Sequence, residues 1–223
     1  MYYNPIVTNL LRAILALGAV AALFFTLARP VEFTTVFARE DGIVEYSTAI
    51  LLFCASLALV GLALRNTGKN RVLLGLYALL FFFAAGEEVS WGQRIFGWES
   101  GEFWQENNYQ NETTLHNLVV GDVHLAEEVF GNALSLILLS YLVVLPLVYP
   151  IAGWARRFCE LLAVPVPPRY IAALAVLWTI FIVWIDLNRN WEVYEFAFSV
   201  FACLIFLNPH NRALAEKTEP PAP

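Results

Sequence analysis

The stretch "RVLLGLYALLFFFAAGEEVSWGQR", residues 71 to 94, decides the fold of this chain. Its run from Val72 to Ala85 is apolar throughout and has 14 residues. As a helix rising ~1.5 Å per residue, this run is about 21 Å long. The hydrocarbon core of a membrane is roughly 30 Å thick. We therefore expect the helix to carry Glu87 and Glu88 to membrane depth before it ends.

The whole chain shares this apolar character. Hydrophobic residues make up 59% of its 223 residues and charged residues only 14%, which is far from the balance of a soluble globular domain. We expect an all-α, polytopic membrane bundle in one domain, residues 1–212, followed by a disordered tail, residues 213–223. Because no cleavage-site pattern follows the first apolar run, that run is expected to stay as a helix. The six expected spans are about 9–29, 44–64, 72–91, 129–151, 170–188 and 189–208.

The charged residues indicate the direction of these spans. With the N-terminus inside, nine basic residues fall on the inner side and four on the outer side. The positive-inside rule then places both termini in the cytoplasm. Sixteen of the nineteen acidic residues fall at the outer end, and acids contribute little to topology, so their position needs another explanation. Segment 156–169 contains three prolines and is expected to form an interfacial turn on the inner side.

Further acidic residues are expected at membrane depth near the outer end. Only residues 196–207 of the last span are uninterrupted, so Glu192 and Glu195 are drawn into the membrane, and Asp186 is a third case. A charge inside a bilayer costs at least ~2.5–3.5 kcal/mol, so such residues normally face the bundle interior and pair. An ion-pair network with Arg94 and Arg189 is one explanation. Two arginines cannot neutralise five embedded acids, so protons or a bound cation must supply the rest.

The long polar connection 92–128 adds possible metal ligands. Glu112 and His116 are four residues apart, as are His124 and Glu128, and on a helix this spacing places two side chains on one face. A salt bridge or a cap is the alternative role of each pair. The candidate ligands of a divalent metal are Glu88, Glu112, His116, His124 and Glu128. Imidazole with carboxylates suits zinc, iron or manganese, whereas an all-oxygen set suits calcium, and the sequence does not choose.

A metal at this position predicts an enzyme. The cation would polarise a carbonyl or phosphoryl oxygen, or lower the pKa of bound water toward ~7. Glu87 or Glu195 would transfer protons, and Gln93 and Arg94 would orient the substrate. The candidate catalytic residues are Glu87, Ser90, Gln93, Arg94 and Glu195. We expect a metal-dependent hydrolase or transferase that acts on a membrane lipid or a lipid-linked substrate at the outer leaflet.

Two other classes of function stay open. Embedded acids also form relays in transporters of cations or protons, although the inner half of every span is apolar here. The acids and arginines could instead serve partner recognition in a non-catalytic subunit of a membrane complex. The basic residues are few and dispersed, which argues against a nucleic-acid partner.

Three motifs carry a resemblance to known proteins. "EEVSWGQR" (87–94), "NNYQNETTLHN" (107–117) and "EDGIVEY" (40–46) resemble the signature of a family of bacterial polytopic membrane proteins. This implies a bacterial inner membrane with the polar site on the periplasmic side, and brings no mechanism.

A looser similarity is to the alkaline-ceramidase-like membrane hydrolases, in which carboxylate, serine and histidine side chains surround a metal at one membrane face. Ser90, His116 and His124 would take these parts. That family has seven spans and takes its zinc histidines from transmembrane helices. This chain departs from the pattern, with six expected spans and no outer-facing histidine after His124.

Overall fold

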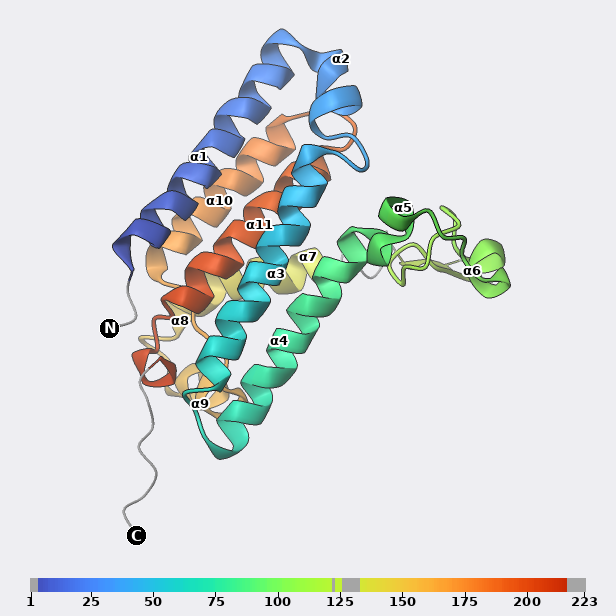
Figure 1. Cartoon of the computed structure of the whole chain (residues 1–223). Coiled ribbons are helices and arrows are strands. Elements are labelled where there is room, and N and C mark those ends of the chain that lie inside the picture. Colours follow the sequence, from blue (N-terminus) through green and yellow to red (C-terminus); the bar gives the residue numbers. More distant parts are fainter. Residues whose placement is uncertain (1–3, 122, 126–132, 216–223) are drawn as a thin grey trace.

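The computed structural model describes residues 4–121, 123–125 and 133–215. Over these residues the fold is all-α, as the composition predicts, and about 74% helical. Four helices are long and apolar enough, by length and composition, to cross a membrane. They are α1 (Pro5–Ala28), α3 (Ile43–Ala63), α4 (Gly68–Glu88) and α11 (Asn190–Leu207) (Figure 1).

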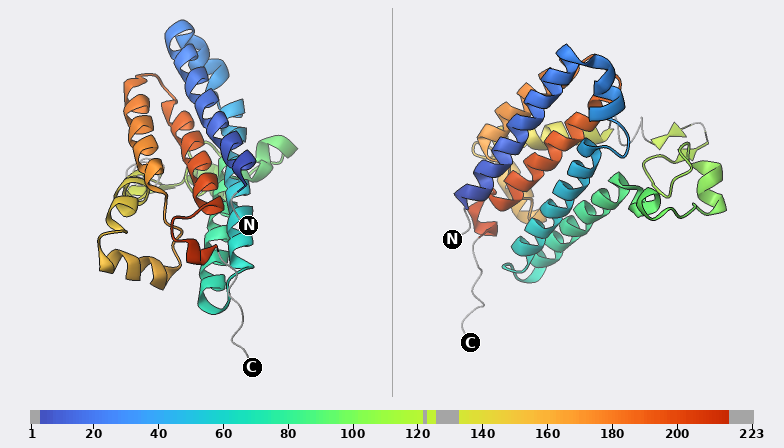
Figure 2. Two further views of the ribbon diagram at one scale, coloured as in Figure 1. Left: turned by 90° about the vertical axis from the view of Figure 1, so that its left-hand side faces the viewer. Right: turned by 45° about the horizontal axis from the view of Figure 1, so that its top comes forward.

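Two further apolar segments are shorter. The first combines α7 (Leu134–Leu139), the π-helical turn Ser140–Val144 and α8 (Leu145–Val148), and the second is α10 (Arg169–Trp184). Both fall below the length of the four long helices, so the predicted spans 129–151 and 170–188 correspond to shorter helices. The side chain of Asn190 explains where α10 ends, because it donates to the carbonyls of Ile182 (3.2 Å) and Ile185 (2.8 Å). Figures 1 and 2 show α10 beside α11.

The core of the bundle surrounds α11. Helix α3 packs against both α4 and α11, and α1 packs against α11. Most side chains of α11 after Val193 are buried. The hydroxyl of Ser56 on α3 donates to the carbonyl of Ala78 on α4 (2.7 Å), which holds these two helices in register. At the contact of α1 with α11, a Cβ on Gly18 would lie 2.5 Å from the ring of Phe196, so a larger residue there would force the ring or the helix to shift.

The start of α1 and the end of α11 lie at the same end of the bundle. The side chain of Asn208 donates to the hydroxyl of Thr8 (3.2 Å). Asn66, between α3 and α4, donates to the carbonyl of Leu214 (2.8 Å). We call this the terminal end. The opposite end, where α4 ends and α11 begins, is called the acidic end.

The structure refines two expectations at the terminal end. Helix α9 (Gly153–Leu162) occupies the first half of the predicted interfacial turn, and only the segment after Ala163 is extended and proline-rich. The tail predicted to be disordered from residue 213 begins within a helical turn, Arg212–Leu214, and Leu214 is buried. The rest of that tail, from residue 216, lies outside the described residues.

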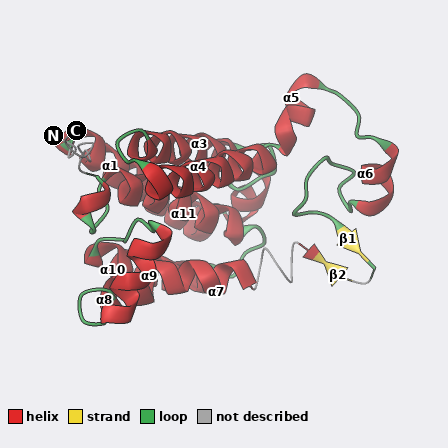
Figure 3. Cartoon of the chain, turned by 90° about the horizontal axis from the view of Figure 1, so that it is seen from below, coloured by secondary structure: helices red, strands yellow, loops and turns green. Residues whose placement is uncertain are grey.

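The segment after α4 forms a lobe of short elements, residues 89–121 and 123–125, which we call the outer lobe. It contains the 3-10 turn Ser90–Gly92, α5 (Gln93–Phe96), α6 (Glu102–Asn107) and the antiparallel strands β1 (Val119–Val120) and β2 (Val123–His124). Figure 3 shows the outer lobe projecting away from the long helices. At the same end, α2 (Pro30–Glu32) and the π-helical turn Phe33–Phe37 connect α1 to α3.

Candidate functional site

The turn that follows α4 has an unusual backbone. Ser90, Trp91 and Gly92 have φ values of 47°, 54° and 80°, which are all left-handed. For the two residues with side chains this conformation costs roughly 1–2 kcal/mol each. The turn folds Trp91 back on α4, where its indole packs on Gly86 and its Nε1 donates to Glu87 Oε1 (2.8 Å). Strained backbone of this kind persists only where the surrounding contacts fix it.

Glu87 attaches the outer lobe to the end of α4. Its side chain is buried, and Oε2 accepts hydrogen bonds from the backbone N–H groups of Leu115 (2.6 Å) and His116 (3.1 Å). The ring Nδ1 of His116 lies 3.4 Å from the same oxygen. Because Trp91 donates to Oε1, both oxygens of Glu87 have partners. These contacts give Glu87 a positioning role in the structure.

Ser90 and Arg94 hold a second acid of the lobe. The hydroxyl of Ser90 donates to Oε2 of the buried Glu112 (2.6 Å), and Arg94 contacts the other oxygen of Glu112. Arg94 also pairs with Asp41 (2.9 Å) and with Glu40, which precede α3. Burial opposes the charge of the guanidinium, but the hydrogen bonds and charges of Glu40 and Asp41 outweigh it and raise the pKa of Arg94.

Gln93 is a further residue of the motif "EEVSWGQR" (87–94) that contacts the outer lobe. Its Oε1 accepts from the hydroxyl of Ser100 (3.1 Å) and the backbone N–H of Thr113 (2.9 Å), and its Nε2 donates to the carbonyl of Asn111 (3.3 Å). Asn108 shapes the same loop by accepting from two backbone N–H groups of the lobe. We call the side chains of Glu87, Ser90, Gln93 and Arg94, with their partners, the loop clamp.

The predicted ligand pairs do not lie on helices in the described residues. Residues 112–116 form a loop, so the spacing of Glu112 and His116 does not place them on one helical face. Both nevertheless reach the end of α4, through Ser90 and Glu87. The main chain of His124 lies in β2, whereas its side chain and the whole of Glu128 lie outside the described residues.

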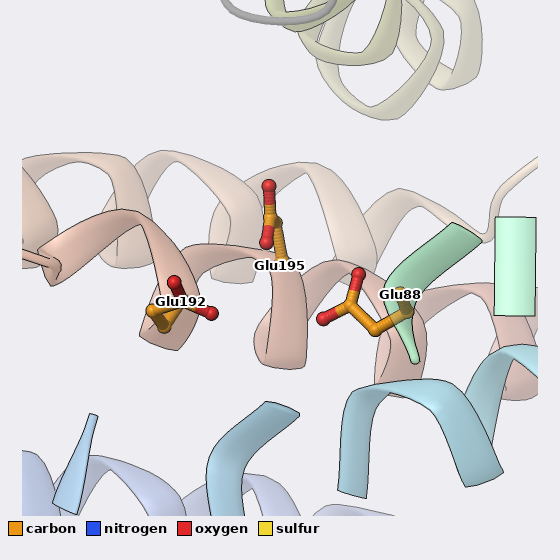
Figure 4. Close-up of side chains that lie close together, drawn as sticks. All are labelled: Glu88, Glu192 and Glu195. Atoms are coloured by element: carbon orange, nitrogen blue, oxygen red, sulfur yellow. The ribbon is translucent and has the colours of Figure 1, made fainter. Parts of the chain in front are cut away.

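Glu88 belongs to a different group of side chains. Glu88 on α4 and Glu192 and Glu195 on α11 each offer a carboxylate oxygen, and these oxygens lie within 4.8 Å of one another (Figure 4). We call these three residues the carboxylate triad. Oε1 of Glu88 is buried and has no hydrogen-bond partner. Glu195 is exposed, so the triad is open on one side. Glu45 on α3 lies within electrostatic range of all three.

The charge of the triad is only partly compensated by arginine. Arg189 lies 3.5 Å from Glu192 and 3.5 Å from Glu40, and Glu40 in turn contacts Arg94 of the loop clamp. Among the described residues no arginine pairs with Glu88 or Glu195. Two carboxylate charges within 4.8 Å of each other repel by at least about 3 kcal/mol at an effective dielectric constant of ~20. A proton or a cation would remove this repulsion.

The loop clamp and the triad are neighbours at the acidic end. Arg189 and Glu40 connect them by ion pairs, and His116 lies within electrostatic range of Glu192. Asp186 lies in the turn after α10 with an exposed side chain, and its expected position at membrane depth stays a prediction.

The triad contains one of the five predicted metal ligands, Glu88, and one of the predicted catalytic residues, Glu195. Sequence reasoning assigned no site role to Glu192, although its position three residues before Glu195 in "EVYE" indicates a shared helical face.

Comparisons with protein-family models, curated proteins and solved structures found no match to this chain. The function is therefore argued from the geometry of the acidic end. The resemblance carried by the three sequence motifs stays a prediction.

Proposed function

We propose that the chain is an integral protein of a bacterial inner membrane with six spans. Helices α7–α8 and α10 would supply the two spans beyond the four long helices. An even number of spans brings both termini to one side, which agrees with the contact between Thr8 and Asn208. Arg65, Lys69 and Arg71 lie in or beside the turn between α3 and α4, at the terminal end. The positive-inside rule then assigns the terminal end to the cytoplasm and the acidic end to the periplasm.

A reporter fusion tests this orientation. Alkaline phosphatase is active only in the periplasm. When it is fused after residue 215, at the proposed cytoplasmic end, we expect it to be inactive. The same enzyme inserted at Gly101, in the outer lobe, is expected to be active. The reverse pattern would contradict the orientation.

We propose that the carboxylate triad binds a divalent cation. The observation that carries this proposal is the buried Oε1 of Glu88, which has no hydrogen-bond partner and lies beside the carboxylates of Glu192 and Glu195. Buried charges in proteins are paired or coordinate metals. All donors of the triad are carboxylate oxygens, and His116 is held on Glu87, so a hard cation such as calcium, magnesium or manganese suits the site better than zinc.

A cation at the triad would support hydrolysis or group transfer on a membrane lipid or a lipid-linked substrate. It would polarise a carbonyl or phosphoryl oxygen, or acidify a bound water. Glu195 faces an open side of the site, so a substrate could approach there. The aromatic and apolar side chains of Trp91, Trp191 and Val36 are exposed at the acidic end and suit a lipid environment.

Elemental analysis of the detergent-purified protein tests the metal proposal. We expect near-stoichiometric divalent metal in the wild-type protein and its loss in Glu88→Gln, which keeps the shape of the side chain and removes its charge. Asp186→Asn is the matched control, because it removes an exposed acid at the same end. Equal metal contents in Glu88→Gln and Asp186→Asn would contradict the proposal.

Transport of a cation or a proton is the second candidate function. It is favoured by the meeting of Glu45, Glu88, Glu192 and Glu195 from three packed helices, because embedded acids of this kind form ion pathways. Flux into proteoliposomes separates the two functions. Flux that disappears in Glu88→Gln supports transport, whereas metal binding without flux supports the enzyme.

A further inference from the structure

Helix α9, at the terminal end, has three different faces. Ala155 and Cys159 are buried against the protein. The large apolar side chains Trp154, Phe158 and Leu161 are 69%, 49% and 59% exposed. Their spacing of four and three residues places them on one stripe of the helix. The exposed charged side chains, on the remaining face, are those of Arg156, Arg157 and Glu160.

The position of α9 is fixed by contacts on both sides of its C-terminal end. The hydroxyl of Tyr77 on α4 donates to the carbonyl of Leu162 (2.9 Å). Asn211 binds the chain just after α9, donating to the carbonyl of Val164 (2.9 Å) and accepting from the N–H of Val166 (2.9 Å). The exposed apolar stripe is therefore held in place as part of the folded protein.

The direction of α9 differs from that of the long helices. In the left view of Figure 2, α9 lies at the terminal end and runs crosswise to the long helices. A helix in this position, with one apolar stripe and one charged face, has the pattern of helices that lie in the membrane interface.

We infer that α9 lies in the plane of the membrane surface at the terminal end and binds anionic lipids there. Trp154, Phe158 and Leu161 insert among the acyl chains. Arg156 and Arg157 bind lipid phosphate groups. The occupant that we infer is a lipid surface, because α9 lies at the end of the long apolar helices, where a bilayer that they cross would have its boundary. Further basic residues at this end are Arg65, Lys69, Arg71, Arg169 and Arg212.

This inference does not depend on the triad, which lies at the opposite end of the bundle. It predicts that the terminal end senses the charge of the leaflet that it contacts. Each arginine near an anionic surface strengthens binding by about fivefold. Two adjacent arginines thus give α9 a clear preference for anionic over neutral lipids.

Depth measurements with spin labels test the insertion. Cysteine is introduced at position 154, 156 or 158 in a Cys54→Ala background, and the labelled protein is reconstituted in phosphatidylcholine and phosphatidylglycerol vesicles. The native Cys159 stays unlabelled, because it is buried and burial raises the pKa of its thiol to about 11. Labels at 154 and 158 are expected to collide with oxygen and to be protected from a water-soluble nickel complex. The label at 156 should show the reverse. Equal nickel accessibility at all three positions would overturn the inference.

The lipid class is tested by the melting midpoint in detergent. Added phosphatidylglycerol is expected to raise the midpoint of the wild-type protein more than phosphatidylcholine does, whereas inorganic phosphate has no such effect. The double variant Arg156→Gln/Arg157→Gln should lose most of this difference. Arg29→Gln, which removes an exposed arginine at the acidic end, should retain it. An unchanged difference in the double variant, or a wild-type response to phosphate alone, would overturn anionic lipid binding by α9.

Discussion

Glu87 and Glu88 are neighbours in the chain and belong to two different regions of the molecule. Both oxygens of Glu87 accept hydrogen bonds from the outer lobe and the strained turn. One oxygen of Glu88 is buried without any hydrogen-bond partner, among carboxylates of α11. The acids of the loop clamp, Glu87 and Glu112, each contact donor groups within the chain, whereas no arginine among the described residues pairs with Glu88 or Glu195 of the triad. A structural role suits the first, and a ligand suits the second.

Helix geometry explains how adjacent residues separate in this way. Successive side chains of an α-helix point about 100° apart. At the last turn of α4, the side chain of Glu87 therefore faces the outer lobe, and that of Glu88 faces α11. The pair of acids in "GEEVSWGQR" thus connects a structural element to a candidate site.

The largest effect is expected from Glu87→Ala. This change removes the acceptor of two backbone N–H groups and of the Trp91 indole, so it should lower the stability of the folded protein by about 3 kcal/mol. The melting midpoint in detergent measures the loss. Limited proteolysis should show faster cleavage within the outer lobe. A lobe as resistant as that of the wild-type protein would show that Glu87 does not hold it.

Arg94→Lys tests whether the geometry of the clamp matters beyond its charge. Arg94 contacts Glu40, Asp41 and Glu112 together, which a single ammonium group cannot reproduce. We expect a loss of about 1–2 kcal/mol, because the buried Glu112 keeps its charge with a poorer partner. The melting midpoint should fall by less than in Glu87→Ala. A midpoint equal to that of the wild-type protein would mean that charge alone is sufficient.

The smallest effect in the clamp is expected from Ser90→Ala. The change removes one hydrogen bond to Glu112, at a cost of about 1 kcal/mol, and leaves the left-handed backbone in place. Thermal unfolding of Ser90→Ala and of Ser90→Gly separates the two contributions. The glycine variant should be the more stable of the two, because it relieves the strain of the positive φ. If alanine were the more stable, the turn would not be strained.

Sequence reasoning located the acidic end but not its internal arrangement. The short apolar run before Glu87 predicted that the helix continues through Glu87 and Glu88, and α4 does include both, although it ends at Glu88 and not at the expected residue 91. The depth of these acids in a membrane stays a prediction. The direction of each carboxylate depends on α11 and the outer lobe, which are distant in the sequence. The spacing of Glu112 and His116 suggested a helical face, but side-chain hydrogen bonds of Asn108 hold that segment as a loop.

The terminal end shows a similar limit of sequence reasoning. The prolines after Ala163 correctly predicted a break in helical structure. The expected turn began at residue 156 and so included Phe158 and Leu161, which share a helical spacing with Trp154 just before it. The side chains of this apolar stripe are about half exposed. Whether the stripe belongs to the protein core or to the surface depends on which face of the helix packs against the bundle. That information is present in the fold and absent from the local pattern.

Titration of Mn²⁺ into the metal-free protein, followed by the electron paramagnetic resonance signal of the free ion, tests the central claim most directly. The comparison is between Glu88→Gln, in the triad, and Ser90→Ala, two residues away in the loop clamp. We predict one binding site in the wild-type protein and in Ser90→Ala, and loss of that site in Glu88→Gln. If no Mn²⁺ binds to the wild-type protein, or if Glu88→Gln binds it equally well, the triad is not a metal site.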